Sequence, residues 1–207
     1  MRLHVTGATG YLGSELVRLR PDASTERVEV RDADAVRELF ERVRPEVVIH
    51  TAYRQDDPDV NTRGSENVAR AAAGVCARLV HLSTDVVFDG RKGAPYVEDD
   101  PLSPVTDYGR AKAEAEARVA ATHPAALLVR TSLLYGGAMS SKHELAARDP
   151  DLTFFTNEIR SPVHVTDLAQ ALLELAELDI AGPLHVAGAD AVSRAAFAEL
   201  ISRGAVR

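Results

Sequence analysis

MRLHVTGATGYLG, residues 1–13, joins a short apolar run to three glycines spaced three apart. The run predicts a buried strand and the residues after the glycines predict a helix, a context typical of a phosphate-binding turn. Gly7 would permit the tight turn, Gly10 would let the backbone approach a pyrophosphate, and Gly13 would let the helix pack closely on the strand. The first amides of the helix would then face phosphate charge. The spacing differs from G-x-G-x-x-G, and on spacing alone a turn without a ligand fits equally well.

The rest of the first 137 residues alternates apolar runs with amphipathic segments, which indicates a parallel sheet covered by helices. We therefore expect an α/β fold of the Rossmann type, a doubly wound parallel sheet that binds ligands outside the carboxyl ends of its strands. Strands are predicted at residues 2–6, 27–30, 47–52, 79–82 and 127–130, and helices at 11–19, 33–43, 62–73 and 107–121.

After residue 137 the pattern weakens. Residues 1–137 are predicted to form the dinucleotide-binding domain, and residues 138–207 a small substrate lobe with some segments that return to the main domain. The predicted elements are a short helix at 142–148, strands at 152–155 and 184–187, and helices at 165–178 and from 194 onward. Because residues 138–151 look abbreviated, the lobe is expected to be incomplete.

Composition argues against several classes of function. Of 207 residues, 45% are hydrophobic and 27% are charged, which is typical of a soluble globular protein, and the net charge of −7 argues against a nucleic-acid partner. No apolar stretch is long enough to span a bilayer, so no membrane contact is expected. The single cysteine, Cys76, is expected to be a small buried apolar group. With one cysteine and scattered histidines no metal site is expected, and a reducing cytoplasm is the natural setting.

The reactive candidates are a Tyr-Lys pair and a hydroxyl upstream of it. Tyr108 and Lys112 are four apart on a predicted helix, so they share a face. An ammonium beside a phenol would lower the pKa of Tyr108 from about 10, which suits a proton donor and acceptor. Thr84 ends an apolar run, and its hydroxyl could donate to a developing alkoxide. The alternative is that Tyr108 and Lys112 lie on a solvated helix face.

Seven motifs stand in order along the chain: TGATGYLG, PEVVIHTAY, NTRGSENVARAA, LVHLSTDVVFDG, Y-x-E-x-D-P-x-x-P, YGRAKAEAE and LLVRTSLLYG. With this set the chain resembles the extended short-chain dehydrogenases, and specifically their dTDP-4-dehydrorhamnose reductase (RmlD-like) branch. The resemblance covers residues 1–137 closely and 152–201 loosely.

The resemblance implies a nicotinamide cofactor, NADP or NAD, and a role for each matching position. Tyr108 would protonate a sugar keto oxygen, Lys112 would tune that tyrosine and hold the nicotinamide ribose, and Thr84 would orient the carbonyl. The positions implied at the cofactor are Gly7, Thr9, Gly10, Tyr11, Leu12 and Gly13 in the pyrophosphate turn, Glu29 and Val30 at the adenine, and Ala52 and Tyr53 beyond their strand. Asp85 and Val86 would lie at the substrate, although Asp85 could equally cap a loop.

Two departures from the family concern specificity. Only residues 20–26 separate the first helix from the segment matching the third strand of the family, so the second strand is expected to be short or missing. That strand reads the ribose 2′ position: Glu29 or Asp32 would favour NAD, whereas Arg18, Arg20 or Arg31 could take a 2′-phosphate. The second departure is Val86, which stands where the family has tyrosine and removes a sugar contact.

Other polar residues have quieter expected roles. Asn61 is a candidate helix cap or water relay, Arg130 a structural ion pair, and His50 and His81 buried hydrogen-bonded groups.

We interpret the chain as an NAD(P)H-dependent reductase of a keto group on a nucleotide-linked sugar, monomeric or homodimeric. One alternative is a cofactor-binding regulatory protein without turnover, like the regulatory subunit of methionine adenosyltransferase. The other is an NAD-dependent sugar epimerase or dehydratase.

Overall fold

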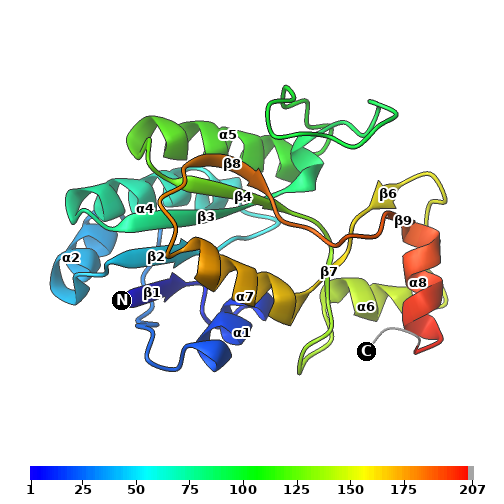
Figure 1. Ribbon diagram of the computed structural model, residues 1–207, viewed down its shortest axis with the longest axis horizontal. Helices are drawn as coiled ribbons and strands as arrows, with labels where there is room; N and C mark the ends of the chain where they lie inside the picture. The colour runs from blue at the N-terminus through cyan, green and yellow to red at the C-terminus, as the bar shows by residue number, and fades with distance from the viewer. Residues whose placement is uncertain (205–207) are drawn as a thin grey trace.

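A five-stranded parallel sheet forms the centre of the computed structural model, which describes residues 1–204 (Figure 1). Neighbouring strands are parallel throughout, with Val5 opposite Ile49 and Thr84 opposite Thr131. All five carboxyl ends therefore lie at the same end of the sheet. In spatial order the strands are β1 (Leu3–Thr6), β2 (Val47–His50), β3 (Arg78–Thr84), β4 (Leu127–Thr131) and β8 (Gly182–His185).

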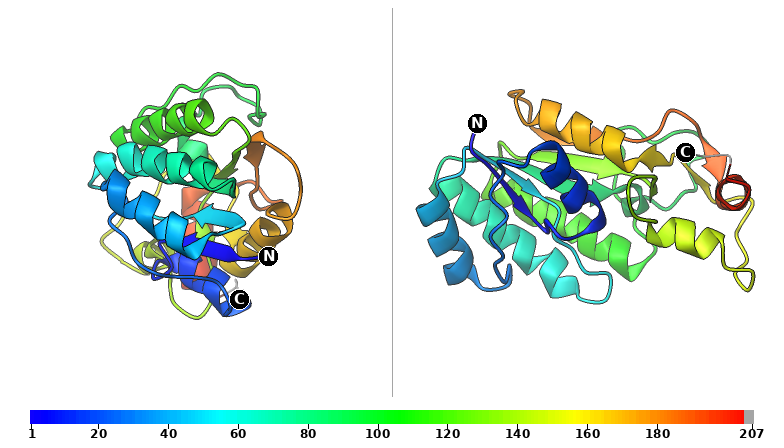
Figure 2. Two further views of the ribbon diagram at one scale, coloured as in Figure 1. Left: turned by 90° about the vertical axis from the view of Figure 1, so that its left-hand side faces the viewer. Right: turned by 90° about the horizontal axis from the view of Figure 1, so that it is seen from below.

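Helices cover both faces of the sheet, and the strands therefore carry apolar residues on both sides. Residues alternate between the two faces: Val5 packs with Leu16 on one, whereas His4 meets Phe40 on the other. Burying a side chain such as Leu16 or Phe40 contributes about 1.5–3 kcal/mol. The helices are α1 (Tyr11–Leu19) and α7 (Val165–Leu175) on the first face, and α2 (Ala33–Val43), α4 (Arg63–Gly74) and α5 (Asp107–Thr122) on the second (Figure 2). The expected doubly wound α/β fold is confirmed.

Local signals fix the ends of the helices. The carboxylate of Asp32 caps α2 by accepting a hydrogen bond from the backbone amide of Ala35 at 3.0 Å. Thr106 caps α5 in the same way through the amide of Gly109, also at 3.0 Å. Asp32, a candidate for reading the ribose, is thus used as a helix cap.

The predicted strand at 27–30 is wrong. On the side of β1 away from β2, Ser24 alone among residues 1–204 pairs with it, as a single parallel bridge to His4 with backbone hydrogen bonds of 2.8 and 3.0 Å. The chain then leaves the sheet because Val30 is buried among the helices of the second face, where Asn67 Nδ2 donates to the Val30 carbonyl at 3.0 Å. The family's second strand is thereby reduced to one residue pair, and β1 becomes an outer strand.

The residues after β4 divide between the main domain and a small lobe. α7 packs on α1, and β8 pairs with β4, so both belong to the main domain. The lobe has its own apolar core, which includes Leu133 and Phe197. Its elements are β5 (Leu134–Tyr135), α6 (Lys142–Ala147), β6 (Ile159–Arg160), β7 (Val163–His164), β9 (Val192–Ser193) and α8 (Arg194–Ser202).

Two further expectations are wrong. Residues 152–155 form no strand: the Phe155 carbonyl accepts a hydrogen bond from the Ala195 amide at 3.1 Å, but no ladder forms, and the Phe155 side chain is 70% exposed. Cys76 is exposed and has a positive φ of 56° in the turn between α4 and β3, where its amide bonds the carbonyl of Ala73. The Cys76 side chain therefore lies in solvent, although its neighbour Ala77 is buried in the core of the second face.

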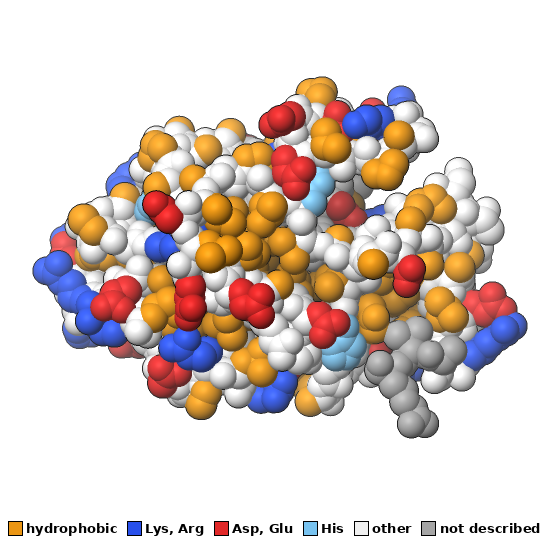
Figure 3. All heavy atoms as spheres, in the orientation of Figure 1, with side chains coloured by type: hydrophobic (Ala, Val, Ile, Leu, Met, Phe, Trp, Pro, Cys, Tyr) orange, Lys and Arg blue, Asp and Glu red, His pale blue; other side chains and the backbone are white. Residues whose placement is uncertain are grey.

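Apolar side chains gather on the face of the molecule over β8 and α7 (Figure 3). Leu178 and Ile180, in the connection between these elements, are 51% and 36% exposed. Within residues 1–204, no helix combines the length and apolar character needed to cross a membrane.

Candidate active site

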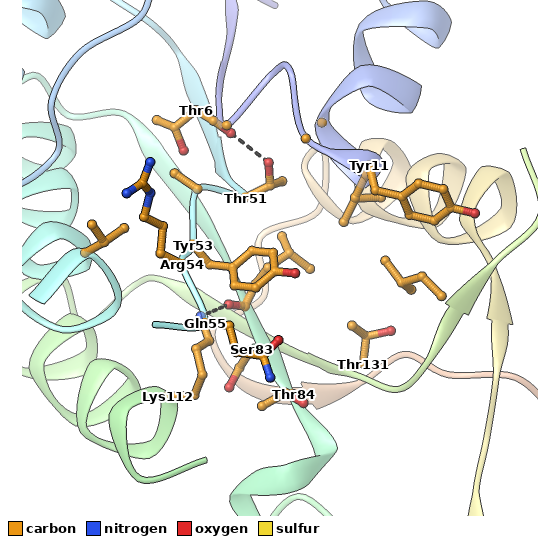
Figure 4. Close-up of a pocket in the computed structure, with 18 of the residues that line it drawn as sticks. Thr6, Tyr11, Thr51, Tyr53, Arg54, Gln55, Ser83, Thr84, Lys112 and Thr131 are labelled. Atoms are coloured by element: carbon orange, nitrogen blue, oxygen red, sulfur yellow. Dashed lines mark hydrogen bonds between the residues drawn. The ribbon is translucent and has the colours of Figure 1, made fainter. Parts of the chain in front are cut away.

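A cavity of about 990 Å³ opens at the carboxyl ends of the strands. Its walls come from the turn after β1, the ends of β2, β3 and β4, the start of α5, and the lobe. Figure 4 shows Tyr53, Ser83, Thr84 and Lys112 gathered in one part of it, with Thr131 next to Thr84, its partner in the sheet, and Tyr11 farther across. The three catalytic candidates and the positions expected in the pyrophosphate turn, at the adenine and beyond β2 all line this cavity, whereas Asp32, Arg18 and Arg20 do not.

The glycine turn is built for close backbone packing. Gly7 has a positive φ of 70°, which favours glycine, and its carbonyl accepts a hydrogen bond from the Gly10 amide at 2.9 Å. A Cβ at Gly13 would lie 2.1 Å from that same carbonyl oxygen. Gly10 begins α1 without any side-chain cap, so the first amides of the helix face the cavity without a side-chain acceptor. Such an end suits an anion.

Tyr11 and Leu12 do more than line the turn. The Tyr11 hydroxyl donates to the carbonyl of Gly136 and lies 3.3 Å from Glu144 Oε2, so it ties the turn to the lobe. Burial, with the Glu144 charge, raises the pKa of Tyr11. Leu12 is buried in the core between α1 and the sheet.

The part of the cavity lined by residues 25–31 carries several charged side chains. Glu29 binds Arg31 through both carboxylate oxygens at 2.9 Å, and these hydrogen bonds lower the pKa of Glu29 to about 2. Arg31 also reaches Asp57 at 2.9 Å. Of the arginines considered for a 2′-phosphate, Arg31 alone lines the cavity, since Arg18 and Arg20 pair with acids outside it. Two further lining arginines, Arg27 and Arg54, belong to no motif that we recognised.

The three catalytic candidates lie on two adjacent elements. Thr84 ends β3, and Tyr108 and Lys112 occupy successive turns of α5. The Tyr108 ring lies 6.0 Å from the ring of Tyr53. The Lys112 ammonium donates to the carbonyl of Leu82 and is buried.

The expected effect of Lys112 on Tyr108 is wrong in this structure. Burial, followed by Tyr53 and Asp85, raises the pKa of Tyr108. Lys112 does not offset this increase, because its ammonium is bonded to the Leu82 carbonyl, and its own burial lowers the pKa of Lys112 to about 8.

Buried polar groups lie beneath the site, on the side of α4 and α5. His50 Nδ1 is 2.6 Å from Thr6 Oγ1 and its Nε2 is 3.1 Å from Ser65 Oγ, and burial lowers the pKa of His50 to about 3. His81 stacks on His50 with ring centroids 5.3 Å apart, and its Nε2 lies 3.5 Å from Lys112 Nζ. The buried roles expected of both histidines are confirmed.

Arg130 forms the structural ion pair expected of it. Its Nη2 lies 2.8 Å from Glu116 Oε2, both side chains are almost fully buried, and the Ser83 hydroxyl donates to the same carboxylate. Asn61, at the end of the short helix α3 (Pro58–Asn61), is not the helix cap considered for it: its side-chain amide bonds both backbone groups of Arg54 and closes the loop that follows Tyr53.

Asp85 and the lobe differ from expectation. Asp85 begins the 3-10 turn η1 (Asp85–Val87), and its carboxylate is bound by Arg160 of β6. Val86, but not Asp85, lines the cavity. Five lobe residues also line it and were missed, because no motif contains them: Ser141, Lys142, His143, Glu158 and Arg160.

A parallel sheet with helices on both faces and a glycine turn after β1 are the features of the Rossmann class of dinucleotide-binding folds. A family model described as the RmlD substrate binding domain matches residues 1–206, and the chain belongs to this family.

The chain is also similar in sequence and structure to proteins with known names. The dTDP-4-dehydrorhamnose reductase of Mycolicibacterium smegmatis is 34% identical over 93% of this chain and 66% of its own length. The methionine adenosyltransferase 2 subunit beta of Rattus norvegicus is 31% identical over 93% of this chain and 69% of its own. The chain thus spans about two thirds of the length of these two relatives. A crystal structure of the dTDP-4-dehydrorhamnose reductase of Bacillus anthracis in complex with NADP has a TM-score of 0.88 at 28% identity, over 99% of this chain and 80% of that one.

Proposed function

We propose that the protein is an NAD(P)H-dependent reductase that converts a keto group of a nucleotide-linked sugar to a hydroxyl. The observation that carries this proposal is the placement of Thr84, Tyr108 and Lys112 on the same cavity as the uncapped glycine turn. The named reductases among its relatives support the reaction class.

The residues of the cavity fit a nicotinamide dinucleotide. The first amides of α1 would receive the pyrophosphate, and the missing side chains at Gly7 and Gly13 keep the turn close to β2 and α1. Glu29, Val30 and Arg31 would lie at the adenosine end, and Ala52 and Tyr53 along the dinucleotide. When bound, the reduced nicotinamide supplies the hydride.

Thr84 and Tyr108 would act on the keto oxygen. The hydroxyl of Thr84 would donate a hydrogen bond to it, and Tyr108 would transfer its phenolic proton as negative charge develops there. Tyr108 is protonated at neutral pH and so has a proton to give, although its raised pKa makes it a weaker acid than an exposed tyrosine. Lys112, held at the Leu82 carbonyl, would fix the ribose next to Tyr108.

Replacing Tyr108 tests this assignment. Tyr108→Phe removes the transferable proton, and we expect turnover of a dTDP-linked 4-keto sugar with NADPH, followed by nicotinamide absorbance, to fall about 10²–10⁴-fold. Binding of NADPH, followed by fluorescence, should be unchanged. Tyr96→Phe is the matched control, because the Tyr96 hydroxyl donates to Asp89 outside the cavity, and it should keep full turnover.

A cofactor-binding protein without turnover is the second candidate, favoured by the identity with the methionine adenosyltransferase subunit. NADPH binding by the unmodified protein without turnover of nucleotide-linked keto sugars would favour this candidate. Full turnover by Tyr108→Phe would instead refute the role of Tyr108 as acid.

A further inference from the structure

An arginine of the lobe holds the acid that follows Thr84. Arg160 Nε lies 2.8 Å from Asp85 Oδ2, and its Nη2 donates to the other oxygen, so the pair is bidentate. Arg160 Nη1 donates to Glu158 at 3.0 Å. Its side chain is 15% exposed and that of Asp85 is 31% exposed. The pair therefore joins β6 of the lobe to the turn after β3, beside the cavity.

Asp85 is in turn bonded to Thr84. The Thr84 hydroxyl lies 3.3 Å from Asp85 Oδ1 and donates to it, while the amide of Val86 donates to Thr84 Oγ1 at 3.3 Å. A threonine hydroxyl has one hydrogen to give. Asp85 therefore competes for the hydrogen that Thr84 would offer to a substrate, and the competition grows stronger when the carboxylate carries an uncompensated charge.

We propose that Arg160 is a positioning residue of the reductase: by binding the Asp85 carboxylate, it weakens Asp85 as an acceptor and leaves the Thr84 hydroxyl free to donate to the keto oxygen. This role rests on the proposed function. It also explains why a cation from the lobe is directed at Asp85 rather than into solvent.

The charges around the site agree with this arrangement. Asp85 raises the pKa of Tyr108 and Arg160 lowers it, so both groups act on the phenol electrostatically and with opposite sign. Arg160 therefore cancels a negative charge next to the developing alkoxide, where such a charge would oppose catalysis. His143 also lines the cavity, and the charges of Arg160 and Asp85 shift its pKa in opposite directions.

Three variants and their combinations test the proposal. Arg160→Met should lower kcat about 10- to 100-fold with little change in the KM for NADPH, because the Thr84 hydroxyl is lost to Asp85. Arg160→Met combined with Asp85→Asn removes both charges and should recover kcat to within about threefold of the starting enzyme. In a Thr84→Val background, Arg160→Met should lose most of its effect on kcat, because only the uncompensated charge of Asp85 near the alkoxide remains. A purely structural role of Arg160 would give neither the rescue nor this loss of effect.

Controls separate folding from positioning. Arg37→Met and Asp34→Asn break an exposed pair on α2, 3.0 Å apart, and should leave kcat unchanged. Melting temperatures show whether Arg160→Met is folded. If it is not, Arg160→Lys replaces it: lysine keeps the charge but not the bidentate fork, so kcat should lie between that of the starting enzyme and the loss expected for Arg160→Met. Undiminished kcat in Arg160→Met, or no recovery on adding Asp85→Asn, would overturn the inference alone. Absence of turnover in the unmodified protein would refute the proposed function and this role together.

Discussion

The buried pair of Glu116 and Arg130 offers a quantitative test of what holds the site together. The side chains are 4% and 6% exposed, and Arg130 Nε and Nη2 lie 2.8–3.1 Å from the carboxylate oxygens. Glu116→Gln keeps the shape but leaves the guanidinium without a countercharge. Breaking a buried pair on one side costs about 3–5 kcal/mol. Arg130 keeps the carbonyl of Glu98 at 3.0 Å and the ring of Phe88, which favours the lower end of that range.

Urea unfolding measures this loss directly. With a slope of about 2 kcal/mol per molar urea, Glu116→Gln should lower the midpoint by roughly 1.5 M. Glu114→Gln is the matched control on the same helix, because the pair of Glu114 with Arg118 is exposed to solvent and screened, and its midpoint should hardly move. Changing both buried partners, as Glu116→Met with Arg130→Leu, should restore much of the loss. Equal shifts for Glu116→Gln and Glu114→Gln would refute the reasoning.

Two more predictions follow from the glycine turn and from the buried lysine. Gly13→Ala places a Cβ 2.1 Å from the Gly7 carbonyl oxygen, so NADPH binding measured by fluorescence should be lost. Gly74→Ala is the control, because a Cβ there meets open space, and it should bind NADPH normally. Normal NADPH binding by Gly13→Ala would contradict this packing argument. The pKa of Lys112 is lowered from 10.5 to about 8, so the unfolded chain holds this proton to higher pH than the folded one. Between pH 8 and 10.5 the unfolding free energy should therefore rise by about 3 kcal/mol relative to that of Lys112→Met. If the unfolding free energies of the two proteins change in parallel over this pH range, the lowered pKa of Lys112 is refuted.

Local patterns in the sequence predict the sheet and the glycine turn well. Strands β1 to β4 are apolar runs bounded by turn residues, and the spacing of Gly7, Gly10 and Gly13 reports a backbone geometry that few other residues allow. The spacing of four residues between Tyr108 and Lys112 predicts that they share one face of a helix, and both line the cavity.

The failures share a different cause, which is long-range contact. Residues 27–30 alternate like a strand, but Asn67 draws Val30 to the helices, and no local pattern reveals that contact. Arg160 is 75 residues from Asp85 and belongs to no motif. The pKa of Tyr108 depends on burial and on where the Lys112 ammonium points, and neither is visible in a four-residue spacing.

Because only a single bridge at Ser24 lies beyond it in the described part of the chain, β1 is one of the two outer strands of its sheet. An exposed strand edge can template pairing with another chain and so promote aggregation. Here the next residues of the same chain carry Glu26, Arg27, Glu29 and Arg31, and all four lie beside the cavity. Their charges discourage a second strand from adding to this edge. The segment that lines this part of the cavity thus also disfavours edge-to-edge association of the sheet.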